Sequence, residues 1–308
     1  MFNAAVFLIV GLALLFKSGH WFVDGAASLA RALNLSSVVV GAVVLGFGTS
    51  APELVVSTIA AWRGNPALGV GNIVGSNVAN MSLILGIAGL ITTVNLSRSV
   101  IRRQAPLSIA SVAVFALFVM DGKLTRTDGV ILVALLIAAM VYLVRAPSES
   151  VEEFSGVKVS PVRSLLKVTI GLVGVLAGAN FAVLGATNLA EGLGLSGGFI
   201  GFSLVAVGTS LPELVTVIVA ARKGETGLII GNLFGSNVFN SLAVAGAMGL
   251  IGAGRIGDPS LTRFGIGSMF AVVLLAYCLG VRKSCISRVD ALLLLAVYGL
   301  TMTVLAVI

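Results

Sequence analysis

The sequence predicts an all-α, polytopic membrane protein of ten transmembrane helices, arranged as two inverted repeats of five helices with broken helices in each repeat. Three observations predict this fold class. Of the 308 residues, 58% are hydrophobic and only 10% are charged, whereas about a quarter of a soluble domain is charged. Apolar runs of about twenty residues, long enough to cross a bilayer as a helix, recur along the whole chain. Two long segments, one in each half, also closely repeat each other.

Ten hydrophobic segments are expected to cross the membrane. They are residues 3–28, 37–61, 67–92, 104–120, 128–145, 164–190, 197–221, 226–252, 262–281 and 289–307. The first segment has no basic residue before Lys17, so it lacks the positive n-region of a secretory signal and is expected to remain a permanent span. We expect residues 1–146 to form the first half and 164–308 the second, joined by a polar cytoplasmic linker, 147–163.

The basic residues indicate how these spans are oriented. With the N-terminus outside, thirteen lysines and arginines fall in inside connections and five in outside connections. The positive-inside rule therefore favours both termini outside. Because the basic residues are scattered between apolar segments, the net charge of +7 indicates membrane orientation and no nucleic-acid partner. No organellar signal is visible, so a prokaryotic inner membrane is the simplest expected location.

An internal repeat relates the two halves. Residues 46–86 align with 206–246 at a constant offset of 160 without a gap, and 19 of the 41 positions are identical. GTSAPELV matches GTSLPELV, and GNIVGSNVAN matches GNLFGSNVFN. Five spans per half, an odd number, place the second copy in the membrane in the opposite sense to the first. This pattern is typical of an inverted-repeat transporter with its site near the midplane, between repeat regions of about 37–92 and 197–252.

Two acidic residues, Glu53 and Glu213, lie near the middle of predicted spans and at matching positions of the repeat. An acid at bilayer depth costs roughly 3 kcal/mol on insertion scales, and no lysine or arginine lies at the same depth to compensate it. Each glutamate directly follows a proline, which predicts a break in the helix at Ala51 and Leu211. We therefore expect a bound cation beside two broken helices.

Hydroxyl and amide side chains accompany both glutamates. In the two copies they are Thr49, Ser50, Ser76 and Asn80, and Thr209, Ser210, Ser236 and Asn240. Hard cations such as Ca²⁺ and Na⁺ prefer such an all-oxygen set, whereas zinc, copper or iron would require the imidazoles and thiolates that this chain nearly lacks. Asn77 and Asn237 are expected either to touch ions or to brace the broken helices, and Asn72 and Asn232 to be structural.

The paired GTSxPEL and GNxxGSNxxN motifs, in halves of five spans, resemble the α-repeats of the Na⁺/Ca²⁺ exchanger family, particularly its prokaryotic members. The resemblance implies a Ca²⁺ site made by Glu53, Glu213 and two backbone oxygens, those of Thr49 and Thr209. It implies flanking Na⁺ sites that use Ser50, Ser76, Ser210, Ser236 and the carbonyl of Ala206. It also implies that the first and sixth spans slide against the remaining helices to alternate access.

The expected function is therefore secondary antiport of Na⁺ against Ca²⁺. Two carboxylates balance one Ca²⁺, so exchange for more than two Na⁺ would be electrogenic. K⁺-dependent members of the family resemble one another in carrying an aspartate at the position of Asn240, so the neutral Asn80 and Asn240 predict K⁺-independent exchange. Antiport of H⁺ against Ca²⁺ or another divalent cation is the alternative. No cofactor and no obligatory protein partner are expected beyond the transported ions and the lipid bilayer.

Two other functional classes fit parts of the pattern. A passive cation channel could also use acids and carbonyl oxygens, but inverted repeats with one acidic pair favour alternating access. An intramembrane hydrolase could use a repeated serine as its nucleophile, which needs a nearby base. The single histidine, His20, lies outside both repeats, so no enzymatic activity is expected.

Overall fold

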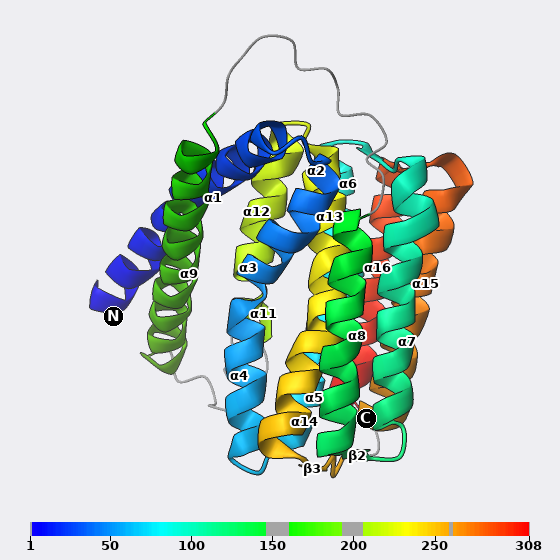
Figure 1. Cartoon of the computed structure of the whole chain (residues 1–308). Coiled ribbons are helices and arrows are strands. Elements are labelled where there is room, and N and C mark those ends of the chain that lie inside the picture. The colour runs from blue at the N-terminus through cyan, green and yellow to red at the C-terminus, as the bar shows by residue number, and fades with distance from the viewer. Residues whose placement is uncertain (1, 146–159, 193–205, 259–260, 308) are drawn as a thin grey trace.

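The computed structural model describes residues 2–145, 160–192, 206–258 and 261–307, and almost all of these are helical (Figure 1). The helices up to residue 145 are α1 (Phe2–Ala32), α2 (Ser37–Val40), η1 (Gly41–Gly46), α3 (Phe47–Thr49), α4 (Ala51–Trp62), α5 (Pro66–Ala79), η2 (Asn80–Ile84), α6 (Leu85–Ile91), η3 (Val100–Gln104), α7 (Ala105–Val119) and α8 (Arg126–Arg145). Elements labelled η are π-helical turns, which join neighbouring α-helices into longer rods.

The second half contains a similar series of helices. They are α9 (Pro161–Gly192), α11 (Ala206–Thr209), α12 (Leu211–Arg222), α13 (Thr226–Val238), η5 (Phe239–Val244), α14 (Ala245–Gly252), η6 (Leu261–Gly265), α15 (Ile266–Lys283) and α16 (Arg288–Val307). Four strands of two residues each complete the described chain: β1 (Val94–Asn95), β2 (Lys123–Leu124), β3 (Gly254–Arg255) and β4 (Cys285–Ile286).

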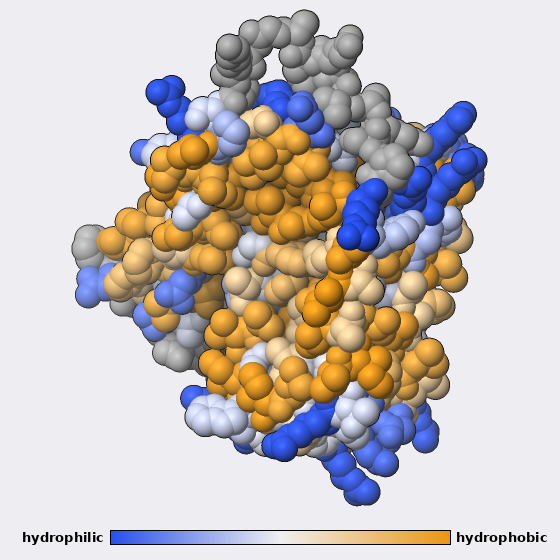
Figure 2. Space-filling view, viewed as in Figure 1, coloured by the Kyte–Doolittle hydropathy of each residue, from blue (hydrophilic) through white to orange (hydrophobic). Residues whose placement is uncertain are grey.

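Many of these helices suit a bilayer. Within the described ranges, seven helices are long and apolar enough to cross a membrane, and the pair Ser37–Thr49 and Ala51–Trp62, bent by 45°, adds an eighth span. The expected span 197–221 begins among residues 193–205, which lie outside the described residues. Figure 2 shows a broad hydrophobic surface across the middle of the molecule, with hydrophilic side chains above and below it. The protein is an integral, multi-pass membrane protein.

Helices α1 and α9 lie together at one side of the molecule, where α1 crosses the view diagonally beside the nearly upright α9 (Figure 1). Glycines allow their backbones to approach closely along the whole contact. A Cβ atom added to Gly185 would lie 2.3 Å from the backbone nitrogen of Leu8, and one added to Gly11 would lie 2.3 Å from that of Ala182. Toward the other end of the pair, a Cβ atom added to Gly171 would lie 2.5 Å from the backbone nitrogen of Phe22, so larger side chains are excluded at both ends.

Matching elements of the two halves run in opposite directions in Figure 1. The chain descends from α2 to α4 but rises from α11 to α12, and it rises from α5 to α6 but descends from α13 to α14. The short strands pair across the two halves: β1 pairs antiparallel with β4, and β2 pairs antiparallel with β3. Each small sheet therefore joins a connection of the first half to a connection of the second.

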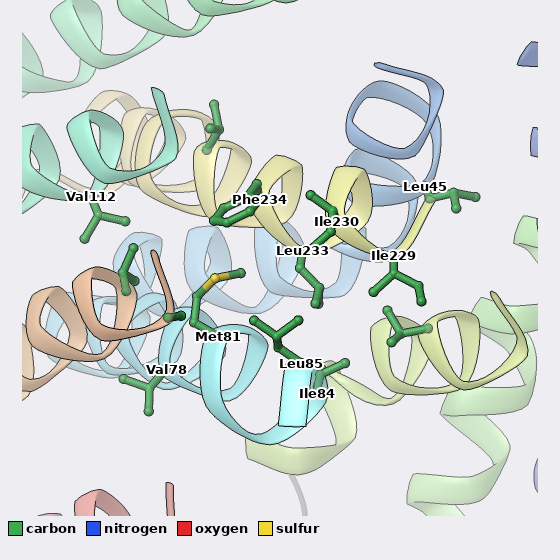
Figure 3. Close-up of a cluster of buried hydrophobic side chains, with 14 of the residues drawn as sticks. Leu45, Val78, Met81, Ile84, Leu85, Val112, Ile229, Ile230, Leu233 and Phe234 are labelled. Atoms are coloured by element: carbon green, nitrogen blue, oxygen red, sulfur yellow. The ribbon is translucent and has the colours of Figure 1, made fainter. Parts of the chain in front are cut away.

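The repeated segments lie at the centre of the molecule. In their most apolar windows, 78% of Pro66–Ile91 and 94% of Thr226–Gly252 are buried. Figure 3 shows side chains of the two segments, including Met81, Leu85 and Leu233, packed against one another. Gly231 and Gly235 let α13 pack directly on the backbone of α2 and η1, since added Cβ atoms would meet Val38 and Ala42 within 2.5 Å. The polar residues of these segments are therefore shielded from lipid.

Candidate cation-binding site

Two broken helices place the repeated GTS and PEL motifs. The breaks fall at Ser50 and Ser210, whose φ and ψ angles are −83° and 9°, and −89° and 4°. We expected the breaks at Ala51 and Leu211, but those residues already begin α4 and α12. Each proline then occupies the second helical position, where its missing N–H breaks no intrahelical hydrogen bond.

The two glutamates lie in the first turns of α4 and α12 and are buried, with 0% and 1% of Glu53 and Glu213 exposed. The positive end of a helix dipole favours a carboxylate at this position. Both acids are thus placed at the breaks and away from lipid, as the sequence predicts.

Serine hydroxyls join each glutamate to the opposite repeat. Ser50 Oγ donates to Glu213 Oε1 at 2.8 Å, and Ser210 Oγ donates to Glu53 Oε1 at 3.3 Å. Ser76 Oγ also donates to Glu53 Oε1, at 3.4 Å. The Oε2 atoms of both glutamates are buried and have no hydrogen-bond partner among the described residues. One oxygen of each carboxylate therefore remains available.

The threonines of the two motifs also contact residues of the opposite repeat. Thr49 Oγ1 donates to the Leu45 carbonyl at 2.9 Å and lies 3.2 Å from Asn232 Oδ1, while Thr209 Oγ1 donates to Asn72 Oδ1 at 3.4 Å. Asn72 and Asn232, expected to be structural, thus contact two predicted site residues across the repeat boundary.

A third set of contacts between the repeats joins the last two asparagines of each GNxxGSNxxN motif. Asn80 Nδ2 donates to Asn237 Oδ1 at 3.1 Å, and Asn240 Nδ2 donates to Asn77 Oδ1 at 3.3 Å. Asn77 and Asn237 therefore brace the opposite repeat, one of the two roles expected for them. The Oδ1 atoms of Asn80 and Asn240 are buried and have no hydrogen-bond partner in the described structure.

The π-helical turns η2 and η5 carry these two asparagines. Turns of this kind are rare and are frequent at functional sites. Nothing in the sequence spacing indicates them, because the same residues would suit an ordinary α-helix.

Ser236 contacts a different partner from its counterpart in the first repeat, Ser76. Ser236 Oγ donates to the Gly46 carbonyl at 3.1 Å and lies 3.5 Å from Asn232 Oδ1, whereas its counterpart Ser76 contacts Glu53. Ala206 is the first residue of α11, and its side chain lies outside the described set. The structure thus joins expected serines to the glutamates and expected asparagines to the opposite repeat, while Ser236 lies beside η1 instead of beside a glutamate.

The unpartnered oxygens define what the site can bind. Among the expected ligand residues they are Glu53 Oε2, Glu213 Oε2, Asn80 Oδ1 and Asn240 Oδ1. A buried acceptor without a donor costs about 1–3 kcal/mol, and more when it is charged, which a cation would offset. The described chain contains no cluster of three or more His, Cys, Asp or Glu residues able to hold a metal. Two carboxylates with neutral oxygens suit Ca²⁺ and Na⁺ better than transition metals.

The hydrolase alternative finds no support in this geometry. Ser50 and Ser210 donate to carboxylates, and His20 is exposed on α1, with its Nδ1 2.7 Å from the Phe16 carbonyl of its own helix. A buried, oxygen-lined site between two broken membrane helices defines an ion transporter instead.

Comparison with known proteins agrees with this class. The chain matches the family of sodium/calcium exchanger proteins over residues 3–145 and 163–307. CaxA of Alkalimonas amylolytica, named as an antiporter, is 36% identical, with 97% of each chain covered. Sodium/calcium exchanger MaX1 of Methanosarcina acetivorans is 28% identical, with 82% of this chain and 85% of that protein covered. A solved structure of the sodium-calcium exchanger NCX_Mj is 32% identical over 98% of both chains, with a TM-score of 0.88.

The chain therefore belongs to the sodium/calcium exchanger family, and its relatives include prokaryotic members. Its named relatives are transporters and not enzymes. The protein is a membrane antiporter of the cation/Ca²⁺ type.

Proposed function

We propose that this protein exchanges Na⁺ for Ca²⁺ by alternating access, without K⁺ and with net movement of charge. Four expected ligand residues, two from each repeat, have a buried oxygen without a hydrogen-bond partner among the described residues, and these oxygens carry this proposal. The names of MaX1 and NCX_Mj, both sodium/calcium exchangers, support the choice of Na⁺ as the coupling ion.

The proposed ligands are those that the resemblance to the exchanger family implies, with Asn80 and Asn240 added from their place in the repeated motifs. Ca²⁺ binds Glu53, Glu213 and the backbone oxygens of Thr49 and Thr209. Na⁺ binds at flanking positions built from Ser50, Ser76, Asn80, Ser210, Ser236, Asn240 and the Ala206 carbonyl. The short cross-repeat contacts of both glutamates support one shared site over two separate ones.

The proposed architecture has ten spans in two inverted halves, 1–146 and 164–308, with the linker 147–163 in the cytoplasm. The opposed directions of α4 and α12 and the exchanged strand pairs support it. We propose a prokaryotic inner membrane with both termini outside, because this orientation keeps most basic connections inside.

Charge sets the expected electrical behaviour. Two carboxylates neutralise one Ca²⁺, but three Na⁺ would leave one positive charge. Such an exchange responds to voltage by about 2.3 kcal/mol per charge per 100 mV. Asn80 and Asn240 add no negative charge, which supports exchange without K⁺.

Uptake of Ca²⁺ into proteoliposomes tests the proposal. Vesicles loaded with Na⁺ should accumulate Ca²⁺. Because net positive charge leaves the vesicle, an inside-positive potential should speed this uptake and an inside-negative potential should slow it. Vesicles loaded with K⁺, or holding only a pH gradient, should not accumulate Ca²⁺. Uptake driven by the pH gradient alone would establish H⁺ coupling, and steady current without counterflow would indicate a channel.

A further inference from the structure

Four buried or partly buried asparagines also contact the opposite repeat. Three of them accept a hydrogen bond at Oδ1 from a residue of the opposite repeat: Asn72 from Thr209, Asn77 from Asn240 and Asn237 from Asn80. Asn232 Oδ1 lies 3.2 Å from Thr49 Oγ1. Whether the amide nitrogen Nδ2 of each asparagine also has a hydrogen-bond partner therefore determines how firmly the orientation of its side-chain amide is fixed.

In the first repeat, both the oxygen and the nitrogen of each of these asparagine side chains have a hydrogen-bond partner. Asn72 Nδ2 donates to Ser57 Oγ at 2.9 Å, and Asn77 Nδ2 donates to Ser241 Oγ at 3.0 Å. Ser57 and Ser241 are fully buried, and neither serine belongs to the proposed ligands.

In the second repeat, only the oxygen of each of these asparagine side chains has a contact with a polar group of the described chain. The Nδ2 atoms of Asn232 and Asn237 are buried and have no hydrogen-bond partner among the described residues. At the constant offset of 160, the counterparts of Ser57 and Ser241 are Val217 and Met81, both fully buried and apolar. The sequence difference thus explains the missing partners.

This difference between the repeats matters because the side-chain amide of an asparagine can rotate by about 180° and interchange its oxygen and nitrogen. The oxygen and nitrogen of an asparagine side chain have nearly the same shape, so only their partners select one orientation. Asn77 Nδ2 also lies 3.5 Å from Met269 Sδ, which can only accept. Turning Asn77 over would place its oxygen against this sulfur, place its nitrogen against Asn240 Nδ2, and require the Ser241 hydroxyl to donate instead of accept. Asn240 Oδ1 therefore stays directed away from Asn77. Asn237 would lose only one bond, so the orientation of Asn80 Oδ1 is less firmly held.

We propose that Ser241 is a positioning residue that preorganises Asn240, a ligand of the second repeat, and so makes the two halves of the cation site unequal. This inference rests on the proposed ion site. A cation that uses Asn240 meets an oxygen already in place, while one that uses Asn80 must first order it.

Ser241→Ala tests the inference in the full-length protein. The half-saturating Na⁺ concentration, measured by isothermal titration in detergent and by Na⁺-driven Ca²⁺ flux, should rise about three- to tenfold, as for one lost hydrogen bond. Maximal flux should stay within about twofold. Met81→Ser, which offers Asn237 an acceptor, should lower the half-saturating concentration.

Ser82→Ala is the matched control, because Ser82 is buried in the same π-helical turn as Met81 and donates only to the Val78 carbonyl. It should leave the Na⁺ dependence unchanged. A Ser241→Ala protein that behaves like Ser82→Ala overturns the inference.

The double variant Ser241→Ala with Asn240→Ala separates this inference from the proposed function. If Ser241 acts through Asn240, adding Ser241→Ala to Asn240→Ala should change Na⁺ binding no further. An equal effect in both backgrounds overturns the positioning role while leaving the site intact. An Asn240→Ala protein with unchanged Na⁺ and Ca²⁺ binding removes Asn240 from the site itself and overturns both.

Discussion

Glu53 and Glu213 each accept serine hydroxyls at Oε1 and leave Oε2 without a partner in the described structure. Their importance could be predicted from the sequence, because an acid in a matching place of two apolar segments needs compensation. Their partners could not. Sequence spacing shows which residues share a helix face, but Ser50 reaches the glutamate of the opposite repeat, and that pairing depends on how the repeats pack.

Replacing Glu53 or Glu213 by glutamine should abolish Ca²⁺ exchange. The substitution keeps the volume of the side chain but removes one of two charges that balance Ca²⁺, so uptake should fall by more than about tenfold. Proteoliposome uptake of Ca²⁺ measures the loss, and Asp121→Asn, at an exposed acid paired with Lys123, is the control. Retained uptake in a folded glutamine variant would exclude that glutamate as a ligand.

At the scale of elements, the broken helices follow from Pro52 and Pro212, but the breaks lie one residue earlier than expected. Proline is well tolerated in the first turn of a helix, so it marks where a helix restarts. The π-helical turns at Asn80 and Asn240 could not be predicted, because an extra residue in a turn is stabilised by packing and not by local sequence.

Pro52→Ala should weaken cation binding although alanine favours a helix. The alanine regains a backbone N–H that can donate to Gly48, which would join α3 to α4 and move Glu53. We expect the half-saturating Ca²⁺ concentration to rise several-fold in calcium titrations, with unfolding temperature unchanged or higher. Pro66→Ala, at the start of α5, is the control. Unchanged binding with Pro52→Ala would mean that the break does not position the ligands.

The α1–α9 contact makes a separate prediction. Gly185→Ala would place a Cβ 2.3 Å from the Leu8 backbone nitrogen and force the helices apart, at a cost of about 1–3 kcal/mol. Thermal unfolding should show a lower midpoint. Ca²⁺ exchange should slow because the resemblance to the exchanger family implies that these two helices slide to alternate access. Gly299→Ala in α16, where nothing lies within 4 Å of the added Cβ, should change neither. Equal midpoints for the two variants would contradict the close contact.

For the whole molecule, the positions of most spans could be predicted because length and polarity determine which segments suit a bilayer. Helices α1 and α9 extend a few residues beyond the expected spans. The strand pairs β1–β4 and β2–β3 could not be predicted, because two-residue strands carry no sequence pattern and form only when the connections of both halves meet.

The proposed orientation predicts which faces are accessible. In a variant with Cys278 and Cys285 replaced by serine, Lys123→Cys should react with a membrane-impermeant maleimide added outside intact cells. Arg98→Cys should react only after the membrane is opened. Both positions are exposed, so burial does not explain a difference. The reverse labelling pattern would place both termini inside.

Anomalous diffraction from crystals soaked in Ca²⁺ tests the central claim most directly, namely that both repeats supply oxygens to one cation site. We expect a peak at about 2.3–2.6 Å from Glu53 Oε2 and Glu213 Oε2, lost when Na⁺ replaces Ca²⁺. A peak that contacts only one glutamate, or none within the buried region, would contradict the account.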